Sequence, residues 1–318
     1  MKKNKLLLPI YLCLSLVIII AAVVVSLTVG VNLGVDFNGG KQIEIKLEDN
    51  ANTNNYESQI NDVLKEYGYK IDSSIIQDKY SDSYYVIKIN ETEISNEKAA
   101  EIREKIANKL EISNENVGDV MSISGNVTQS TIITISIAVA CVLIVFMIVG
   151  WARYGIMEGL SLMFVGLHNM IISLAALLVT TLQLNVPTIV ALLVCTVSAL
   201  VIYTLILENV YESKKLSQNK DLSDNELFGS ANKKSLNNVV IVMIALALIA
   251  IASLFSGMYY IKLFALSLVV CMIISVYSTN LVGVVLGATL AHVKTTAEKE
   301  HLSKNVEQKS TKTQKENK

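Results

Sequence analysis

Gly34-Val35-Asp36-Phe37-Asn38-Gly39-Gly40 separates two very different parts of this chain of 318 residues. The apolar stretch 6–29 precedes it and is long enough to cross a bilayer, because about 20 apolar residues in a helix span the hydrocarbon core. Residues 31–128 have the mixed polar and apolar composition of a water-soluble domain. We therefore predict that this heptapeptide, which we call the junction motif, is where the chain leaves the membrane and enters a folded domain.

The chain as a whole has the composition of a membrane protein. Hydrophobic residues make up 52% of it and the mean hydropathy is +0.47, above the range of ordinary soluble domains. Apolar runs of spanning length predict six transmembrane helices, at 6–29, 132–149, 157–182, 186–207, 239–255 and 261–290. The last run is longer than a bilayer requires, so we expect it to tilt or to end in the interface. The first is too long for the apolar core of a signal peptide, and we expect it to be retained.

The distribution of charge predicts the orientation of these helices. Residues 31–128 contain 18 acidic and 10 basic side chains, whereas the rest of the chain contains 10 acidic and 17 basic ones. The basic residues outside 31–128 gather near the N-terminus, at Arg153, between 214 and 234, and after Lys294. With six spans these four segments lie on one side, which the positive-inside rule makes cytoplasmic. Both termini are then cytoplasmic and the acidic domain lies outside.

Four regions follow from this topology. Residues 1–30 form a cytoplasmic N-terminal tail and the first span, and residues 31–128 form the extracytoplasmic domain. Residues 129–292 form the remaining five spans, with a polar cytoplasmic loop at 208–238 that contains at most one short helix. Residues 293–318 are basic and poor in apolar side chains, a composition typical of a disordered tail.

Alternating polar and apolar residues predict a small α+β domain between the first two spans. Strand patterns occur at 42–47, 71–76, 84–89 and 117–123, and helical spacing occurs at 56–67 and from the N-cap Ser95 to Leu110. The order β-α-β-β-α-β is that of the ferredoxin-like fold. A fold of this kind serves many functions, so it does not by itself indicate one.

The chemistry-bearing residues point away from catalysis. Cys13, Cys141, Cys195 and Cys271 all fall in apolar spans, so we interpret them as small buried hydrophobic residues, without a disulfide framework or a thiolate metal site. The sequence contains no phosphate-binding loop, no His/Cys cluster and no nucleophile elbow. We predict no catalytic residue, no cofactor and no metal, and therefore no enzyme.

Several motifs, taken in order, resemble those of the SecD/SecF family of Sec protein-export membrane subunits, and the chain is most similar to its SecF members. The junction motif resembles the start of the family's extracytoplasmic domain through Gly34, Asp36, Phe37, Gly39 and Gly40. The similarity continues over nearly all of residues 6–291, in the stretches 117–127, 151–154, 167–169, 264–266 and 275–279, the last of which contains Tyr277 and Ser278. Asn126 stands where the family has a proline, and Asn169 follows His168 where the family has aspartate.

This resemblance implies an auxiliary role in export of polypeptides across the bacterial cytoplasmic membrane. The implied partners are a SecD-like subunit, the SecYEG channel and a translocating polypeptide, with membrane lipids around the spans. We expect no nucleic-acid partner, because the basic tail is most simply interpreted as a solvated segment. Gly34, Gly39 and Gly40 would permit positive φ angles or close backbone approach, and Asp36 would fix the turn. An isolated match of this length is also compatible with a generic membrane-exit turn.

One departure from the family concerns proton transfer. Family members resemble proton-driven transporters of the RND type, with an aspartate in the fourth helix and an arginine in the fifth. Here Val201 and Ile202 occupy the positions of the fourth-helix Asn-Asp pair, and Val242 occupies that of the arginine. Loss of one partner alone would leave an uncompensated buried charge, at a cost of several kcal/mol, whereas loss of both removes that cost. We predict that the chain has lost its proton relay.

Three polar residues at membrane depth remain candidates, His168, Asn169 and Tyr203. His168 would carry protons if hydrated, or it would serve packing through hydrogen bonds to Asn169, Ser173 or Tyr203. Glu158 lies near a helix end, from which its carboxylate would reach the aqueous interface.

Two other functions remain open. One is half of an RND-like transporter for small molecules or lipids, which would need an apolar cavity. The other is a purely structural assembly subunit. Co-purification with Sec components, with a lipid or with neither distinguishes the three.

Overall fold

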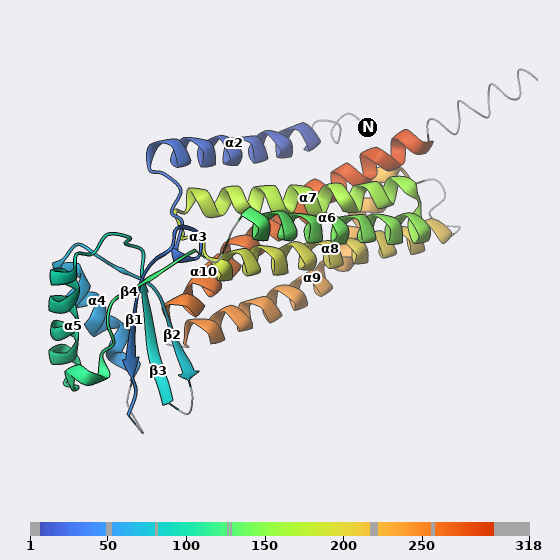
Figure 1. Ribbon diagram of the computed structural model, residues 1–318. Coiled ribbons are helices and arrows are strands. Elements are labelled where there is room, and N and C mark those ends of the chain that lie inside the picture. Colours follow the sequence, from blue (N-terminus) through green and yellow to red (C-terminus); the bar gives the residue numbers. More distant parts are fainter. Residues whose placement is uncertain are drawn as a thin grey trace, which may run out of the picture.

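The computed structural model describes residues 7–48, 53–79, 82–125, 127, 129–216, 222–255 and 258–295. A bundle of long helices and a small domain with one β-sheet stand end to end (Figure 1). Of the basic tail expected to be disordered, residues 293–295 belong to the last helix, and the remainder lies outside the described residues.

Six helices in the described part of the chain are long and apolar enough to cross a membrane, which confirms the number of predicted spans. Five of them are α2 (Leu7–Thr28), α6 (Gln129–Tyr154), α7 (Ile156–Val179), α8 (Val186–Lys215) and α9 (Asp224–Leu254). The sixth consists of α10 (Tyr259–Tyr277), a π-helical turn η4 (Ser278–Gly283) and a further helical stretch to residue 295. A π-helical turn inside a long helix is rare and frequently marks a functional site.

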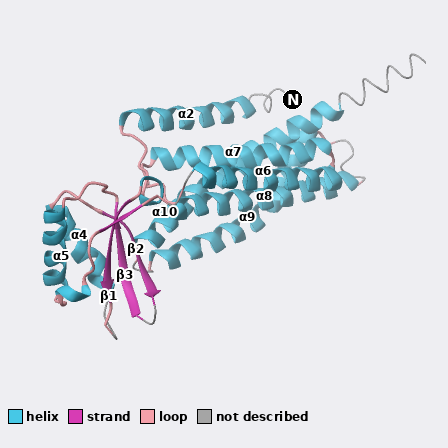
Figure 2. Ribbon diagram, viewed as in Figure 1, coloured by secondary structure: helices cyan, strands magenta, loops and turns pink. Residues whose placement is uncertain are grey.

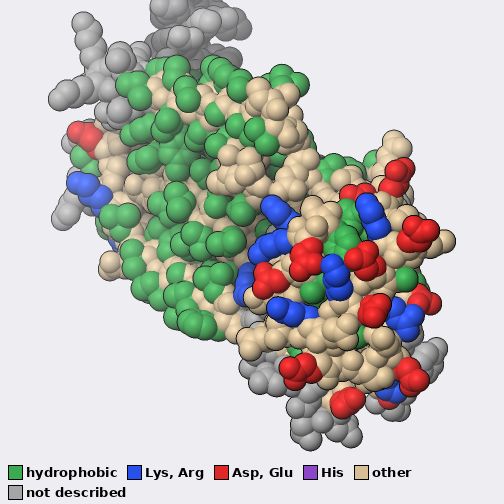
Figure 3. Space-filling model, turned by 90° about the vertical axis from the view of Figure 1, so that its left-hand side faces the viewer, with side chains coloured by type: hydrophobic (Ala, Val, Ile, Leu, Met, Phe, Trp, Pro, Cys, Tyr) green, Lys and Arg blue, Asp and Glu red, His purple; other side chains and the backbone are tan. Residues whose placement is uncertain are grey.

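The bundle has three central and three peripheral helices. The apolar segments of α7, α8 and α10 are 44–50% buried within the chain, whereas those of α2, α6 and α9 are only 6–22% buried. α2 and α6 pack mainly on α7, and α9 packs on α8 and α10. The peripheral helices therefore present apolar side chains outward, and Figure 3 shows hydrophobic side chains spread over this part of the molecule.

The segment 208–238, expected to be mostly a loop, is largely helical. α8 continues to Lys215 and α9 already begins at Asp224, with residues 217–221 between them outside the described part. Ser223 and Glu226 form a capping box at the start of α9, which satisfies two backbone donors that the first turn leaves without partners. Asn209 donates a hydrogen bond to Ser235 over 2.7 Å, joining the two extensions. The polar composition therefore marks where the helices leave the apolar layer, not where they end.

The small domain follows the junction motif, and its described residues form four strands and two longer helices. In chain order these are β1 (Gly40–Lys46), α4 (Tyr56–Glu66), β2 (Ile71–Lys79), β3 (Asp82–Ile89), α5 (Asn96–Leu110) and β4 (Met121–Ile123). Short 3₁₀ turns, η1 (Thr53–Asn55) and η2 (Asn114–Asn116), precede α4 and β4. The sheet has the order β2-β3-β1-β4 with all neighbours antiparallel. Figure 2 shows α4 and α5 together on one side of this sheet.

The core of the domain lies between the sheet and these two helices. Ile43 and Ile45 from β1, Ile60 from α4, and Ile102 and Ile106 from α5 are completely buried. The Ser95 side chain accepts a hydrogen bond from the Lys98 amide and so caps α5, as predicted. The last strand is shorter than expected: Val117 makes only an isolated bridge with Ile45 before β4 pairs with β1.

Replacing Ile43 with alanine should destabilise this domain strongly. Ile43 is fully buried, and removal of a large core side chain costs about 2–5 kcal/mol because a cavity remains. Ile75 on β2 is 37% exposed, so Ile75→Ala is the matched control, with an expected cost of about 0.5 kcal/mol. Hydrogen exchange of the β1 and β3 amides in the full chain measures both values. Equal losses from the two variants would contradict the placement of the core.

Candidate functional site

The junction motif lies against the loop between α7 and α8. The Gly34 amide donates to the Leu184 carbonyl over 3.0 Å, and the Leu184 amide donates to the Asn32 carbonyl over 2.8 Å. The Asn32 side chain adds a hydrogen bond to the Thr181 carbonyl. Leu33 and Leu184 thus form an isolated β-bridge. The first residues after α2 are therefore hydrogen-bonded to the loop that joins α7 to α8.

Asp36 continues this attachment and caps a helix that is distant in sequence. It lies in α3 (Val35–Asn38), is only 3% exposed, and its Oδ2 accepts from the Val186 amide over 2.9 Å and from the Tyr260 hydroxyl over 2.5 Å. Val186 is the first residue of α8, and the N-cap residue Asn185 makes no side-chain cap of its own. Helix N-termini carry unpaired donors and a partial positive charge, so a carboxylate is stabilising there. Asp36 was expected to fix a local turn, but it connects the domain to two helices instead.

Two glycines of the motif are required by geometry. A Cβ on Gly34 would overlap the buried side chain of Asn185 in the bundle loop, so any larger residue at this position would require that side chain to move. Gly39 has a φ of +73°, a conformation that glycine adopts without strain. Gly40 begins β1, packed on the Ile89 carbonyl, and Phe37 is half-buried, its carbonyl directed at Gly125. Gly34 and Asp36 therefore contact the bundle, whereas Phe37, Gly39 and Gly40 lie against the strands and loops of the domain.

This site contains a second carboxylate, which the sequence analysis did not identify. Asp72, in β2, is 2% exposed; its Oδ2 accepts from the Val35 amide over 2.8 Å and its Oδ1 accepts from the Gln183 side chain. Burial raises the pKa of Asp72 to about 6, the hydrogen bond from Val35 opposes the rise, and the nearby charge of Asp36 adds to it. An aspartate within a strand pattern does not by itself indicate a functional site. The sequence pattern does not show that the partner of Asp72 is Gln183, which lies 111 residues away in the loop between α7 and α8.

Inside the membrane part, His168 meets partners different from those expected. His168 on α7 lies with Nε2 2.9 Å from Ser15 Oγ on α2 and with Nδ1 3.1 Å from Ser278 Oγ in η4. The Tyr277 hydroxyl completes the cluster, 2.8 Å from Ser15 Oγ, and donates to the Tyr11 carbonyl over 2.6 Å. Neither Asn169, Ser173 nor Tyr203 appears among its hydrogen-bond partners in the described residues. The sequence motifs containing His168 and Tyr277-Ser278 therefore converge on α2.

Asn169 and Tyr203 belong to other parts of the bundle interior. Asn169 is completely buried and donates to Thr196 Oγ1 on α8 over 3.4 Å. Tyr203, also completely buried, donates to the Gly283 carbonyl over 2.9 Å and lies 3.2 Å from Ser161 Oγ. The three polar candidates thus do not form one site: among the hydrogen bonds of the described residues, His168 is the candidate that is linked to Ser278 of the last-helix motif.

The positions that the sequence resemblance associated with proton transfer carry apolar side chains in this bundle. Val201 is 42% exposed on the outer surface of α8, Ile202 is completely buried, and Val242 of α9 is packed against the core. Glu158, expected to reach the interface, is 6% exposed and pairs with Lys214 over 3.4 Å. Glu158 does not reach water because the last turns of α8, which carry Lys214, cover this end of α7.

An ion pair joins α6 and α8 at the same end of the bundle as Glu158. Arg153 donates from Nε and Nη2 to the two carboxylate oxygens of Glu208 over 2.8 and 2.7 Å, and Tyr154 donates to Glu208 over 2.7 Å.

Of the cysteines, Cys195 and Cys271 are buried as expected, whereas Cys13 and Cys141 lie on the outer surfaces of α2 and α6. Peripheral helices bury few of their side chains, so an apolar span does not ensure burial within the chain.

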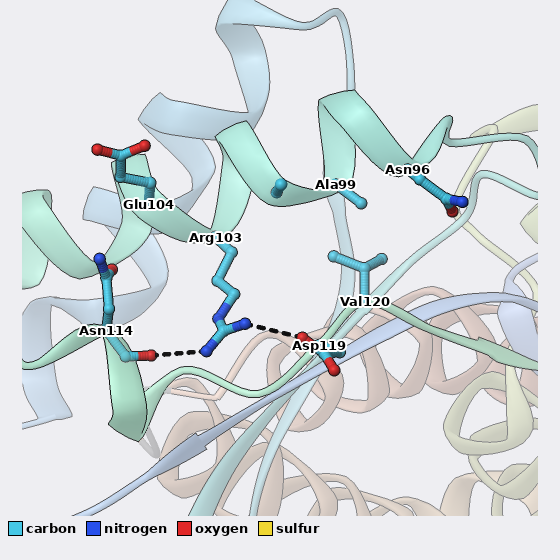
Figure 4. Close-up of a pocket in the computed structure, with 8 residues that line it drawn as sticks. Asn96, Ala99, Arg103, Glu104, Asn114, Asp119 and Val120 are labelled. Carbon is cyan, nitrogen blue, oxygen red and sulfur yellow. Dashed lines mark hydrogen bonds and ion pairs between the residues drawn. The ribbon is translucent and has the colours of Figure 1, made fainter.

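The small domain also carries a cavity of about 570 Å³ beside α5, drawn in Figure 4. Arg103 crosses it and donates to Asp119 Oδ1 over 2.8 Å and to the Asn114 carbonyl over 3.0 Å. Its lining is mostly polar: Asn96, Ala99, Ala100, Arg103, Glu104, Asn114, Asp119 and Val120. This exposed ion pair closes the loop onto α5 and shows no arrangement of catalytic type.

Fold and junction together define a multi-pass membrane protein whose first two helices are separated by a soluble domain seated on the end of the bundle. Residues 99–292 match the model of the family described as protein export membrane protein SecD/SecF, C-terminal. This match covers more than half of the chain, so the chain belongs to the SecD/SecF family. The chain is SecF-like, as the motifs of the junction and of the last helix had indicated.

Individual relatives agree with this assignment. The chain is 24% identical over 283 residues to the protein translocase subunit SecF of Calditerrivibrio nitroreducens, covering 85% of this chain and 88% of that protein. A crystal structure of SecDF in a super-membrane-facing form matches 94% of this chain with a TM-score of 0.69 and 19% identity. The structure of SecDF from Thermus thermophilus, described as a translocon-associated membrane protein, matches 89% with a TM-score of 0.59 and 20% identity. This chain spans only 40% and 37% of those SecDF chains.

Replacing Gly34 with alanine should loosen the junction. The new Cβ would overlap Asn185 Oδ1, and overpacking of this kind costs about 1–3 kcal/mol. Hydrogen exchange at the Gly34 and Leu184 amides should accelerate by roughly tenfold to hundredfold, since each 1.4 kcal/mol is about a factor of ten.

Gly229→Ala provides the control, because a Cβ there meets nothing within 4 Å and alanine is the better helix former. Unchanged exchange at the Gly34 and Leu184 amides in Gly34→Ala would show that the close approach of the loop is not required.

Proposed function

We propose that this chain is a SecF-type auxiliary subunit that assists export of polypeptides across the bacterial cytoplasmic membrane. Membership of the SecD/SecF family carries this proposal, and the agreement over 94% of the chain with a SecDF structure supports its fold. The proposed partners are a SecD-like subunit, the SecYEG channel and the exported polypeptide. The part matched here corresponds to 40% and 37% of the SecDF chains, so we propose that a SecD-like half works beside it.

The proposed orientation places the domain outside the cell and both termini in the cytoplasm. The first described turn of α2 and the last helical residues near 295 lie at the end of the bundle remote from the domain (Figure 1). Lys214, Lys234 and Arg153 also lie at that remote end. An excess of basic residues on one side is what the positive-inside rule associates with the cytoplasm.

For the external domain we propose a ferredoxin-like fold without enzymatic activity. The element order β-α-β-β-α-β, the antiparallel sheet order β2-β3-β1-β4 and the two helices on one side support this assignment. Its role in export would be mechanical: it would contact the emerging polypeptide while the junction ties it to the bundle. The cavity beside α5, drawn in Figure 4, is lined mostly by polar groups, which does not favour the alternative of a small-molecule or lipid transporter.

We further propose that proton-coupled charge movement, where the complex uses it, belongs to the partner. Val201, Ile202 and Val242 cannot ionise, and the buried Glu158 is compensated by Lys214. His168 is satisfied by two serine hydroxyls, which supports a packing role that fastens α2 to α7. The weakly buried surfaces of α2, α6 and α9 would then face lipid or the SecD-like subunit.

Affinity purification of the tagged chain in mild detergent, followed by mass spectrometry, tests this function. The proposal expects a SecD-like protein with an intramembrane aspartate, together with SecYEG, and slower export in cells that lack the chain. Recovery of a lipid or of no Sec component, under conditions that keep Sec complexes intact, would contradict it.

Replacing His168 with glutamine should leave proton-driven export unchanged. A glutamine side chain still donates and accepts hydrogen bonds but does not titrate near neutral pH, so it should preserve the links to Ser15 and Ser278. Export rates measured as a function of the transmembrane proton gradient should coincide with those of the parent chain. A lost dependence on the gradient, with the chain present at normal abundance, would assign proton transfer to His168.

A further inference from the structure

The junction between domain and bundle contains more buried hydrogen-bond acceptors than donors. Asp36 and Asp72 are 3% and 2% exposed, and their donors are the amides of Val35 and Val186, the Tyr260 hydroxyl and the Gln183 side chain. The Asn185 side chain also hydrogen-bonds Asp72, which opposes the rise in the pKa of that carboxyl. Asn185 is completely buried and donates to Gln183 Oε1. Its own Oδ1 has no partner among the described residues, so a buried acceptor beside two carboxylates lacks a donor.

No cation neutralises these two carboxylates within ion-pair distance in the described part of the chain. Lys88 of β3 acts on Asp72 only through the longer-range field, and Lys262 of α10 pairs with Glu57 of α4 over 3.8 Å. Lys70 and Glu91, of opposite charge, line the cavity next to Asp72. Burial removes hydration from the Asp72 carboxylate and the nearby charge of Asp36 repels it, which disfavours ionisation of Asp72.

We propose that Asp72, beside the fixed carboxylate of Asp36, is a proton-binding site at the contact between the soluble domain and the membrane bundle. The proton resides on Asp72 when the domain is seated on the bundle. Protonated, Asp72 becomes a hydrogen-bond donor, which is the group that Asn185 Oδ1 lacks. The Val35 amide still donates to the other carboxyl oxygen, so the seated geometry is retained.

Water reaches this site from the side of the membrane that bears the domain. A cavity of about 420 Å³ opens beside Asp72 and is lined by Asn32, Gly68, Tyr69, Lys70, Ile71, Asp72, Ile89, Asn90, Glu91 and Gln183. Asp72 and Gln183 together form part of its wall, so protons exchange with solvent without entering the hydrocarbon layer. The site is thus distinct from the transmembrane positions at which this chain carries valine and isoleucine.

The raised pKa of Asp72, about 6, sets the direction in which pH acts on the contact. Separation of the domain from the bundle would hydrate Asp72 and return its pKa toward about 4. The seated state therefore takes up a proton: its stabilisation is complete below about pH 4 and is lost as the pH rises through about 6. Acidification of the external water strengthens the contact, and alkalinisation weakens it.

Infrared difference spectroscopy of the full chain in lipid nanodiscs tests the proposal. The spectrum between pH 8 and pH 5 should contain a carboxylic-acid C=O band with a midpoint near pH 6. The band should disappear in Asp72→Asn, which resembles the protonated side chain in shape, and persist in Asp119→Asn, whose side chain is 85% exposed in the parent chain.

If a variant fails to fold, the spectrum of the parent protein alone still tests the proposal. Absence of a carboxylic-acid band in the parent above pH 5, or its persistence in folded Asp72→Asn, would overturn the proposal. Hydrogen exchange at the Val186 and Leu184 amides, corrected for the intrinsic effect of pH, should slow on acidification in the parent and be independent of pH in Asp72→Asn. Neither readout depends on export, so the proton site and the proposed function are tested separately.

Discussion

The hydrogen bond from the first amide of α8 to the Asp36 carboxylate is the contact on which the arrangement of domain and bundle depends. It uses an unpaired donor and the positive end of a helix, and so stabilises a carboxylate where water is excluded. The Tyr260 hydroxyl brings α10 to the same oxygen, while the bridge between Leu33 and Leu184 fixes the backbone. Because the glycine at 34 permits this approach, a few residues attach a whole domain to three parts of the bundle.

Within the membrane the bundle relies on neutral polar contacts between helices. Ser15, His168 and Ser278 join α2 to the centre, and Tyr203 joins α8 to the π-helical turn. Hydrogen bonds of this kind are worth about 0.6–2 kcal/mol in a membrane, enough to set helix positions without the cost of buried charge. Ionised side chains are placed instead at the ends, as in the pairs of Glu158 with Lys214 and Arg153 with Glu208.

Hydropathy predicted the six spans because a bilayer imposes a length and a composition on each helix. The alternating pattern likewise predicted the element order of the small domain, and the N-cap Ser95 marked the start of α5. Contacts between distant segments left no such periodic signal. The pair Asp36 and Val186 is separated by 150 residues, and the pair Ser15 and His168 by 153. Family resemblance directed attention to Asp36 and His168, whereas Asp72 stood in no motif and became evident only when its burial was seen.

The attachment of the domain through Asp36 is tested most directly by a distance measurement between two spin labels. One label would occupy Cys141 on α6 and the other Asp119→Cys on the domain, with the remaining native cysteines replaced. Below the Asp72 pKa of about 6, we expect a single narrow distance distribution in the parent background and a broad one in Asp36→Ala. A broad distribution in the parent that Asp36→Ala leaves unchanged would contradict the account, because the domain would then be tethered by its chain connections alone.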